Sequence, residues 1–163
     1  MPTYPLKRPP SDEQDTGTEP TRGPAWIDVR AVARLRASSE DPQHAIARAF
    51  STTHGPGWRA ADPGVQVIEV HFREPRDLTH IRLVFEHEGP ARTQEFTIAW
   101  SARRGETHRE IVRQQFNFSP GGATREVEDY TMALQGVETL TIRITPDISG
   151  GGARASLAEC RLA

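Results

Sequence analysis

The sequence predicts an all-β fold, a sandwich or jelly roll of about eight antiparallel strands. The first observation is two runs in which apolar and polar residues alternate, at 65–72 and 81–85, joined by a short connection that holds Pro75 and Asp77. Such alternation is typical of strands with one buried face. The second observation is the supply of turn formers, because glycine and proline number 13 each among 163 residues. Together they favour many short strands separated by turns.

The N-terminal segment differs from the rest of the chain. Six of the 13 prolines lie in the first 24 residues, where few residues are apolar. A segment of this composition cannot bury enough apolar surface to offset the entropy that ordering removes. We therefore predict a disordered tail or linker at 1–25 and one folded domain at 26–163.

The elements of the domain follow in order. Alternation begins near Trp26 and predicts a long first strand up to Ala37. The run Ser38–Pro42 supplies a capping side chain and a first-turn proline, so a short helix is predicted after it, up to Phe50. A turn-rich stretch occupies 51–64. The remaining strands are predicted at 65–72, 81–85, 96–100, 110–116, 124–134, 140–144 and 155–162.

Composition excludes several classes of protein. The net charge is −2, so overall charge does not draw the chain to nucleic acid or to an anionic membrane. Lys7 is the only lysine, an arginine bias that a GC-rich coding genome also produces. Cys160 is the only cysteine, so no internal disulfide forms, and its apolar context predicts a buried, unreactive thiol. No apolar run approaches the roughly 20 residues of a membrane span. No secretory pattern opens the chain, so a cytoplasmic location is expected.

No catalytic motif is found. The nucleophile-elbow, metalloprotease and phosphate-loop patterns are all absent. The glycine runs at 121–122 and 150–152 are not followed by helical patterns, so they place no helix N-terminus at a phosphate. The most metal-like cluster, Glu86-His87-Glu88, lies at a strand end, where solvated side chains are expected because metal sites need several convergent ligands. The sequence therefore predicts a binding module and not an enzyme.

Several short motifs occur in a recognisable order. They are Ala37-Ser38-Ser39-Glu40, Ala49-Phe50, Gly57-Trp58-Arg59-Ala60, Ile68 to Pro75, Ile81-Arg82-Leu83, Phe96 to Ser101, Gly105-Glu106-Thr107 and Ser156-Leu157-Ala158-Glu159. In this order the chain resembles the discoidin (coagulation factor 5/8 C-terminal type) and galactose-binding-like domains over roughly residues 27–162. The resemblance implies an eight-stranded antiparallel jelly-roll β-sandwich without catalytic machinery. It also implies loops at one end that bind sugars, or lipid head groups or proteins in other members.

A structural calcium ion is a further implication of the resemblance. Many members hold it with backbone carbonyls of the loop after the short helix and with a glutamate on the last strand, where this chain has Glu159. The family usually has Asp-Gly after Ala-Phe, whereas this chain has Ser51-Thr52. Loss of a carboxylate weakens an oxygen-ligand site. No cofactor is therefore required, and calcium at Glu159 stays a hypothesis.

Carbohydrate is the leading ligand class. Sugar recognition needs a flat apolar face with polar groups beside it. Trp58 offers a ring, although the resemblance implies that it packs beneath the binding loops. Phe116 and Phe118 flank Asn117 in a polar stretch, and the strand pattern cannot bury both rings, so one is expected to be exposed. The candidate ligand-binding residues are His54, Trp58, Arg92, Asn117, Phe118 and Arg154.

The two arginines of this set have two interpretations. The guanidinium fork of Arg92 or Arg154 suits vicinal hydroxyls or a carboxylate. Alternatively, each arginine braces a loop through Asp147 or Glu159. The sequence leaves both interpretations open.

A protein partner is the alternative ligand. The absence of an export pattern argues against a role on extracellular glycans, and the N-terminal segment could tether a partner. Polar strand faces would form the interface, while a nucleic-acid role is disfavoured by the net charge. The residues assigned to that interface are Arg82, Arg109, Arg113, Arg125, Glu126, Glu128 and Asp129.

Overall fold

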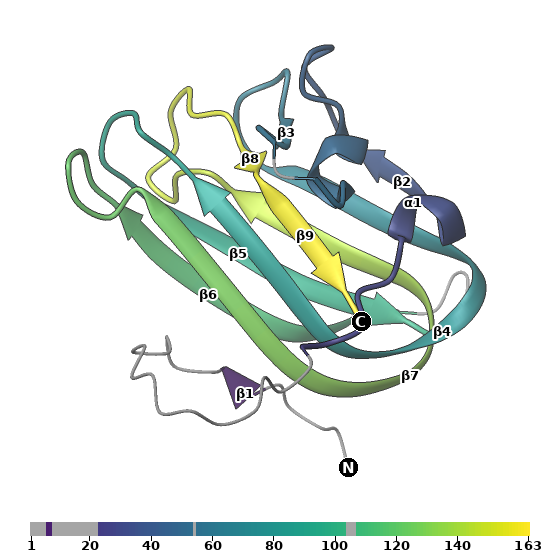
Figure 1. Ribbon diagram of the computed structural model, residues 1–163. Coiled ribbons are helices and arrows are strands. Elements are labelled where there is room, and N and C mark those ends of the chain that lie inside the picture. The colour runs from purple at the N-terminus through teal and green to yellow at the C-terminus, as the bar shows by residue number, and fades with distance from the viewer. Residues whose placement is uncertain (1–5, 8–22, 54, 104–106) are drawn as a thin grey trace.

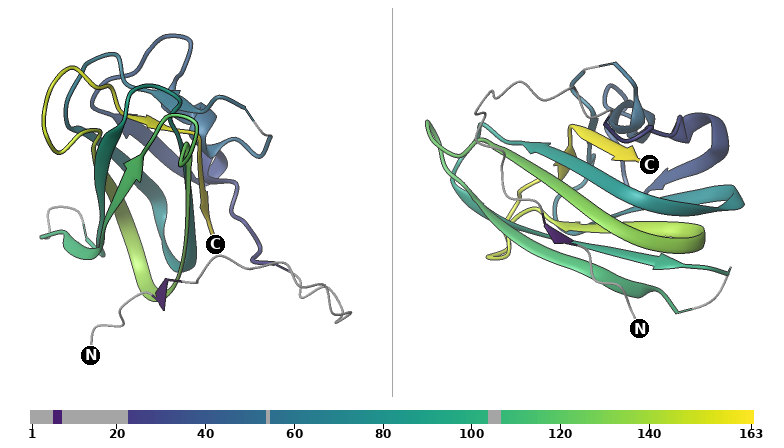
Figure 2. Two further views of the ribbon diagram at one scale, coloured as in Figure 1. Left: turned by 90° about the vertical axis from the view of Figure 1, so that its left-hand side faces the viewer. Right: turned by 60° about the horizontal axis from the view of Figure 1, so that its bottom comes forward.

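The computed structural model describes residues 6–7, 23–53, 55–103 and 107–163. Within these ranges the chain is mostly β-structure, and every pair of strands is antiparallel. The strands form two facing layers, and the segment with η1 and β3 lies beside one end of them (Figure 1, Figure 2). The predicted all-β antiparallel architecture is confirmed.

The described ranges contain nine strands and two helical turns. The strands are β1 (Leu6–Lys7), β2 (Ala33–Ala37), β3 (Trp58–Arg59), β4 (Gln66–Glu86), β5 (Arg92–Ser101), β6 (Arg109–Phe118), β7 (Arg125–Thr145), β8 (Ser156–Leu157) and β9 (Glu159–Leu162). The helical turns are α1 (Val29–Val32) and the 3-10 helix η1 (Ile46–Phe50). No helix in the described part of the chain is long and apolar enough to cross a membrane.

The two longest strands, β4 and β7, each run through both layers. In the first layer the strands lie in the order β2, first half of β4, second half of β7, β5 and β6. In the second layer the second half of β4 pairs with β9 and with the first half of β7. The pairing of β4 with β7 shifts register between His71 and His80, where the two strands bend from one layer to the other.

The bend corrects one detail of the strand prediction. The runs 65–72 and 81–85 are the two halves of β4, and they pair with β7 and not with each other. The connection expected at Pro75 and Asp77 is the bend itself. Asp77 fixes it, because its Oδ1 accepts a hydrogen bond of 2.8 Å from the backbone N–H of Gly136. Gly136 has φ +67, a conformation that favours glycine.

Alternation does predict which side chains fill the core. Ile68 and Val70 of the first layer and Ile81 and Leu83 of the second are all at most 1% exposed. The rings of Phe85 and Phe96 stack across the core with centroids 5.1 Å apart. Burying a side chain of this size contributes about 1.5–3 kcal/mol. Cys160 is also buried, and burial raises the pKa of its thiol, as the sequence predicted.

Three local elements differ from the sequence prediction. The segment expected to be one strand up to Ala37 begins with the α1 turn, and only β2 is extended. The predicted short helix is the 3-10 helix η1, where Glu40 Oε2 accepts a hydrogen bond of 2.8 Å from the N–H of Ile46. Within the predicted tail, Leu6 and Lys7 form β1 and pair with β7.

Candidate functional site

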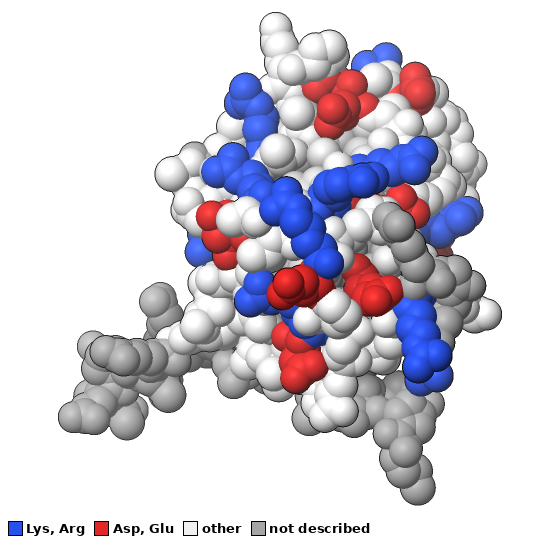
Figure 3. All heavy atoms as spheres, turned by 90° about the vertical axis from the view of Figure 1, so that its right-hand side faces the viewer, with Lys and Arg blue, Asp and Glu red and all other residues white. Residues whose placement is uncertain are grey.

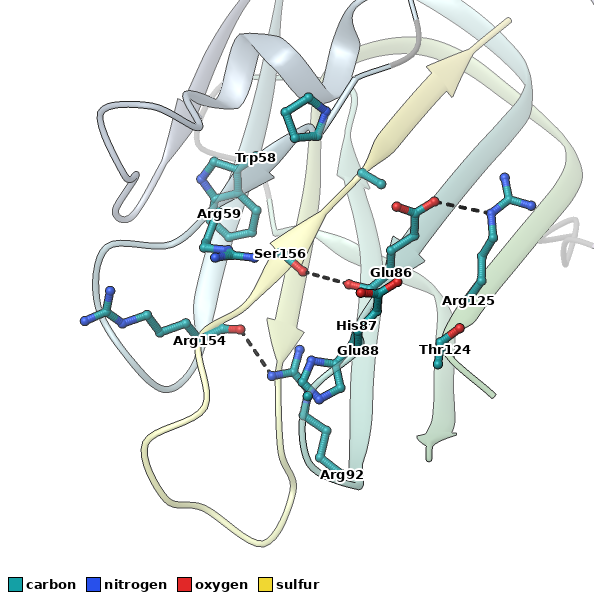
Figure 4. Close-up of a pocket in the computed structure, with 13 residues that line it drawn as sticks. Trp58, Arg59, Glu86, His87, Glu88, Arg92, Thr124, Arg125, Arg154 and Ser156 are labelled. Carbon is teal, nitrogen blue, oxygen red and sulfur yellow. Dashed lines mark hydrogen bonds and ion pairs between the residues drawn. The ribbon is translucent and has the colours of Figure 1, made fainter. Parts of the chain in front are cut away.

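A hollow lies at the loop end of the sandwich. Its volume is about 750 Å³. The β3–β8 pair forms one side, and the connections that follow β4, β6 and β7 form the rest (Figure 4). The lining residues are Pro56, Trp58, Arg59, Glu86, His87, Glu88, Gly89, Arg92, Thr124, Arg125, Arg154, Ser156 and Ala158.

Trp58 fixes the floor of the hollow. Its side chain is 0% exposed, and its Nε1–H donates a hydrogen bond of 3.0 Å to the backbone oxygen of Ser39. The Ser39 hydroxyl in turn accepts from the N–H of Ala61 at 3.1 Å and donates to Gln66 Oε1 at 2.8 Å. This network joins the loop after β2 to the start of β4. The burial of Trp58 that the family resemblance implied is confirmed.

Gly57 allows β3 to approach β8 closely. It has φ +70, and a Cβ atom there would lie 2.3 Å from the backbone oxygen of Leu157 and 2.5 Å from that of Ala158. Such distances are shorter than any van der Waals contact, so a larger residue would push β3 away. The position of Arg59 at the rim therefore depends on a glycine two residues before it.

Arg92 is the best-anchored cation of the site. Its guanidinium carbon lies 5.9 Å from the centroid of the Phe118 ring, and its Nη1 donates a hydrogen bond of 3.3 Å to the backbone oxygen of Arg154. Its Nε is buried without a hydrogen-bond partner in the described part of the chain. Burial lowers the pKa of Arg92, the charge of Asp147 opposes that shift, and the charge of Arg59 adds to it.

The remaining charges divide into paired and unpaired groups. Arg125 Nε lies 3.5 Å from Glu86 Oε1. In the described part of the chain, Arg59 and Arg154 are exposed and make no ion pair. The nearby Asp147 is engaged within its own loop, because its Oδ1 accepts hydrogen bonds from the hydroxyl and the N–H of Ser149, at 2.6 and 3.0 Å. These bonds are the main reason why the pKa of Asp147 lies below its ordinary value.

The structure brings together three of the six candidate ligand-binding residues. Trp58, Arg92 and Arg154 all line the hollow. Asn117 does not line it; it lies on β6, where its Oδ1 accepts a hydrogen bond of 2.6 Å from the Thr93 hydroxyl. His54 lies outside the described residues.

Phe118 requires a correction. Phe118 is one of the candidate ligand-binding residues predicted from the sequence, yet its ring is 2% exposed beneath Arg92. Phe116 packs edge-on against it with centroids 4.9 Å apart and is itself half-buried. Neither ring offers the open flat face that was expected. Phe118 is buried and packs beneath the Arg92 guanidinium.

Sequence reasoning missed several lining residues. Arg59 adjoins Trp58 in the same motif, and that adjacency was the available sign of its role. Glu86-His87-Glu88 was interpreted as a solvated turn, but all three side chains line the hollow. Arg125 opens β7 directly after a glycine-rich connection, a position that points to the loop end.

The contacts of Glu159 do not fit the implied calcium site. Its Oε1 lies 2.5 Å from Arg161 Nε and 3.6 Å from Arg82 Nε. The Ser51 hydroxyl, at the position where the family has aspartate, shares a hydrogen bond of 2.9 Å with the Thr53 hydroxyl. Within the described ranges no three or more His, Cys, Asp or Glu side chains are grouped to hold a metal ion. Glu159 is an ion-pair partner in this arrangement.

The polar interface assigned to a protein partner is not a single face. Glu126 and Glu128 point inward and are 1% and 2% exposed. Arg113 lies on β6, where it pairs with Glu95 and Glu110, whereas Arg82 pairs with Asp129 in the second layer. The assigned residues therefore belong to different surfaces and to the interior.

Comparisons with known proteins agree with this architecture. The family model described as F5/8 type C domain matches residues 34–160. A search of curated protein sequences found no match. Among solved structures, a family 32 carbohydrate-binding module of AlyQ in complex with 4,5-unsaturated mannuronic acid has a TM-score of 0.61 at 14% identity, covering 81% of this chain and 95% of that chain.

Two further structures are similar. The family 32 carbohydrate-binding module of NanJ from Clostridium perfringens, in complex with galactose, has a TM-score of 0.61 at 18% identity, covering 84% of this chain and 96% of that chain. A pectin-binding carbohydrate-binding module has a TM-score of 0.57 at 14% identity, covering 80% and 89%. At these low identities, the TM-scores show a shared fold.

Proposed function

The chain belongs to the F5/8 type C domain family, and we propose that it is a non-enzymatic carbohydrate-binding module whose ligand occupies the loop-end hollow. The observation that carries the proposal is the hollow itself, about 750 Å³ in volume and lined mainly by polar and charged side chains. Small-molecule sites typically have volumes of roughly 300–1,000 Å³. The hollow lies between loops on a rigid sandwich, where binding residues are commonly found.

The similar structures support a sugar as the ligand class. One similar module is in complex with galactose, another is in complex with an unsaturated mannuronic acid, and a third binds pectin, so modules of this fold accept both neutral and acidic saccharides. One similar module comes from a family 31 glycoside hydrolase and another from a chitosanase/glucanase. In this proposal the present domain supplies binding and no chemical step.

The lining residues suit hydroxyl-rich ligands. Arginine side chains donate hydrogen bonds, carboxylates such as that of Glu88 accept them, and the Ser156 hydroxyl does both. Because the hollow is open to water, each such bond replaces one with solvent and adds little net free energy. We expect dissociation constants on the order of 0.1–1 mM for monosaccharides.

A glycan array followed by NMR titration of the full chain tests the proposal. The expected result is saccharide-dependent shifts of backbone amides in 86–92, 119–124 and 146–156, the connections around the hollow. Arg36→Gln, an exposed substitution on β2, serves as a control that should bind as the parent does. If no saccharide shifts these amides, or if shifts occur only on the sheet faces, the proposed site is wrong.

A further inference from the structure

We propose that the ligand is an acidic saccharide, one that contains a uronic acid, and that Arg59, Arg92 and Arg154 hold its carboxylate. The inference rests on the function proposed above and adds the chemical class of the ligand. Three independent features of the hollow lead to it: its unbalanced charge, the burial of its aromatic rings and the unfilled hydrogen-bonding capacity of one guanidinium.

The charge of the hollow is positive on one side. Four arginines line it against two glutamates, and the Arg125–Glu86 pair at 3.5 Å accounts for one of each. Figure 4 shows Arg59 and Arg154 on the side of β8 away from that pair. Of the lining acids, Glu88 is left to balance three guanidinium groups. An anionic group is therefore the complementary ligand for this side.

The tryptophan and phenylalanine rings of the site are not available for stacking, and the His87 ring packs edge-on against Phe118 with centroids 5.5 Å apart. Trp58 is 0% exposed and Phe118 is 2% exposed, so neither presents a face to the hollow. Recognition of a neutral pyranose usually gains from contact between its C–H groups and an open ring. Here the group above Phe118 is the Arg92 guanidinium. The described part of the site thus offers charged, planar donors where a neutral sugar would need an apolar platform.

Most hydrogen-bond donors of Arg92 have no acceptor in the described structure. A guanidinium carries five N–H donors, and within the described residues the side chain of Arg92 makes one hydrogen bond, to the backbone oxygen of Arg154. Its Nε is buried and has no acceptor among those residues. Buried donors without acceptors cost free energy. A carboxylate offers two acceptor oxygens to such a fork, in charge-assisted bonds about twice as strong as neutral ones.

The electrostatics of Arg92 favour the same ligand. Burial works most strongly against the charged form of Arg92, the charge of Asp147 opposes this, and the repulsion from Arg59 is a smaller effect in the same direction as burial. A ligand carboxylate between the two guanidinium groups would reverse that repulsion. A neutral hydroxyl would not.

Paired titrations test the inference on the full chain. NMR titrations with galacturonic acid and galactose, and with glucuronic acid and glucose, compare each acid with the neutral sugar of the same ring geometry. We expect each uronic acid to bind about tenfold more tightly than its neutral parent at low salt, and the difference to shrink as salt rises. Acetate at the same concentrations should bind more weakly than either uronic acid, because it lacks the hydroxyl contacts.

Matched variants assign the effect to the arginines. Arg59→Gln and Arg154→Gln remove exposed guanidinium groups that have no ion pair to lose in the described structure, so both should fold normally. Each should weaken the binding of a uronic acid more than that of its neutral parent, because glutamine keeps hydrogen-bond donors but not the charge, so the acid-over-neutral preference should fall several-fold. Arg36→Gln, on β2 away from the hollow, should keep the full preference.

The outcomes separate the two proposals. If neutral sugars shift the loop amides as strongly as the uronic acids do, the module binds carbohydrate and the acidic-ligand inference is overturned. If no saccharide binds, both proposals fail. Equal binding of acetate and uronic acids, an unchanged preference in both variants, or tighter binding of a short single-stranded DNA would each also overturn the inference.

Discussion

Two groups of arginines in this domain have opposite surroundings. On the outer face of the second layer, Arg82 lies 3.3 Å from Asp129 and 3.6 Å from Glu159, and Arg161 lies 2.5 Å from Glu159. At the loop end, the charge of Asp147 acts on Arg92 and that of Asp41 on Arg59, and neither Arg59 nor Arg154 makes an ion pair in the described structure. The same residue type thus forms ion pairs on a strand face, whereas of the four arginines that line the hollow Arg125 alone does so within the described residues.

The difference teaches where to look for function in an arginine-rich chain. Figure 3 shows a face on the side of β2 and α1 where basic and acidic side chains lie close together, a common way to keep a β-surface soluble. Net charge and composition average over such surfaces and hide a local cluster of arginines such as Arg59, Arg92 and Arg154. The first prediction concerns the packing beneath these three arginines, and the later ones concern the charges themselves.

Trp58→Ala should have the largest effect. The loop end is held by packing below the arginines, so removal of a ring that is 0% exposed should lower the free energy of unfolding by about 3–5 kcal/mol. The melting temperature should fall on the order of 10 °C. Thermal unfolding followed by circular dichroism measures it. Trp58→Phe should lose far less, mainly the hydrogen bond to Ser39. A shift for Trp58→Ala no larger than that of an exposed substitution would contradict this description.

The second prediction compares one arginine from each group. Arg82→Gln removes two ion pairs from the second layer and should lower the free energy of unfolding by roughly 1 kcal/mol or less, since the pairs are partly exposed. Arg154→Gln should leave stability unchanged, because no ion pair of the described structure is lost. Urea unfolding of both variants, at low and high salt, makes the comparison. Equal destabilisation by the two substitutions would remove the distinction between the groups.

The fold could be predicted from sequence because its determinants are local. Alternation over 65–72 and 81–85 identifies the inward side chains of β4 without knowledge of its partners. The continuity of β4 could not be predicted in this way, since Arg73 to Asp77 interrupts the alternation and the bend depends on Gly136, far along the chain. The α1 turn was missed for a related reason: small and apolar residues at alternate positions fit a strand and a single helical turn equally well.

The site was only partly predictable because its residues come from distant connections. The pairing of β3 with β8 brings Arg59 and Arg154 to the same side of the hollow, and no local sequence pattern predicts that pairing. The burial of Phe118 likewise depends on Arg92, which covers the ring from the neighbouring strand. The sequence supplies the residue types, but which arginines of the hollow make ion pairs is seen only in the described structure.

The third prediction concerns Asp147, the acid whose charge acts on Arg92. Hydrogen bonds from Ser149, and then the charge of Arg92, hold the pKa of Asp147 below its ordinary value. A carboxyl group whose pKa is lower in the folded state than in the unfolded state stabilises the fold at pH values above its unfolded-state pKa. That stabilisation is lost as the pH falls through the folded-state pKa. Ser149→Ala should therefore raise the pKa of Asp147 and reduce stability near neutral pH, with the difference vanishing in acid. Carboxyl NMR titration measures the pKa, and Arg92→Gln should raise it less.

The smallest effect is expected for calcium. Glu159 is bound by Arg161 and Arg82, so its charge is already neutralised, and Ser51 has replaced the family's aspartate. A ligand that binds only the folded state adds about 2.7 kcal/mol at a hundredfold excess over Kd. We expect no such stabilisation by calcium, so the melting temperatures in millimolar calcium and in EDTA should agree.

Glu159→Gln distinguishes an ion-pair partner from a metal ligand. If Glu159 forms ion pairs with Arg161 and Arg82, the substitution lowers the melting temperature by the same few degrees in calcium and in EDTA, because the lost interaction does not involve the metal. If Glu159 binds calcium, EDTA lowers the melting temperature of the parent, and Glu159→Gln abolishes that response. The second pattern would remove Glu159 as an ion-pair partner, leaving Asp129 to pair with Arg82, and would weaken the contrast between the two groups of arginines.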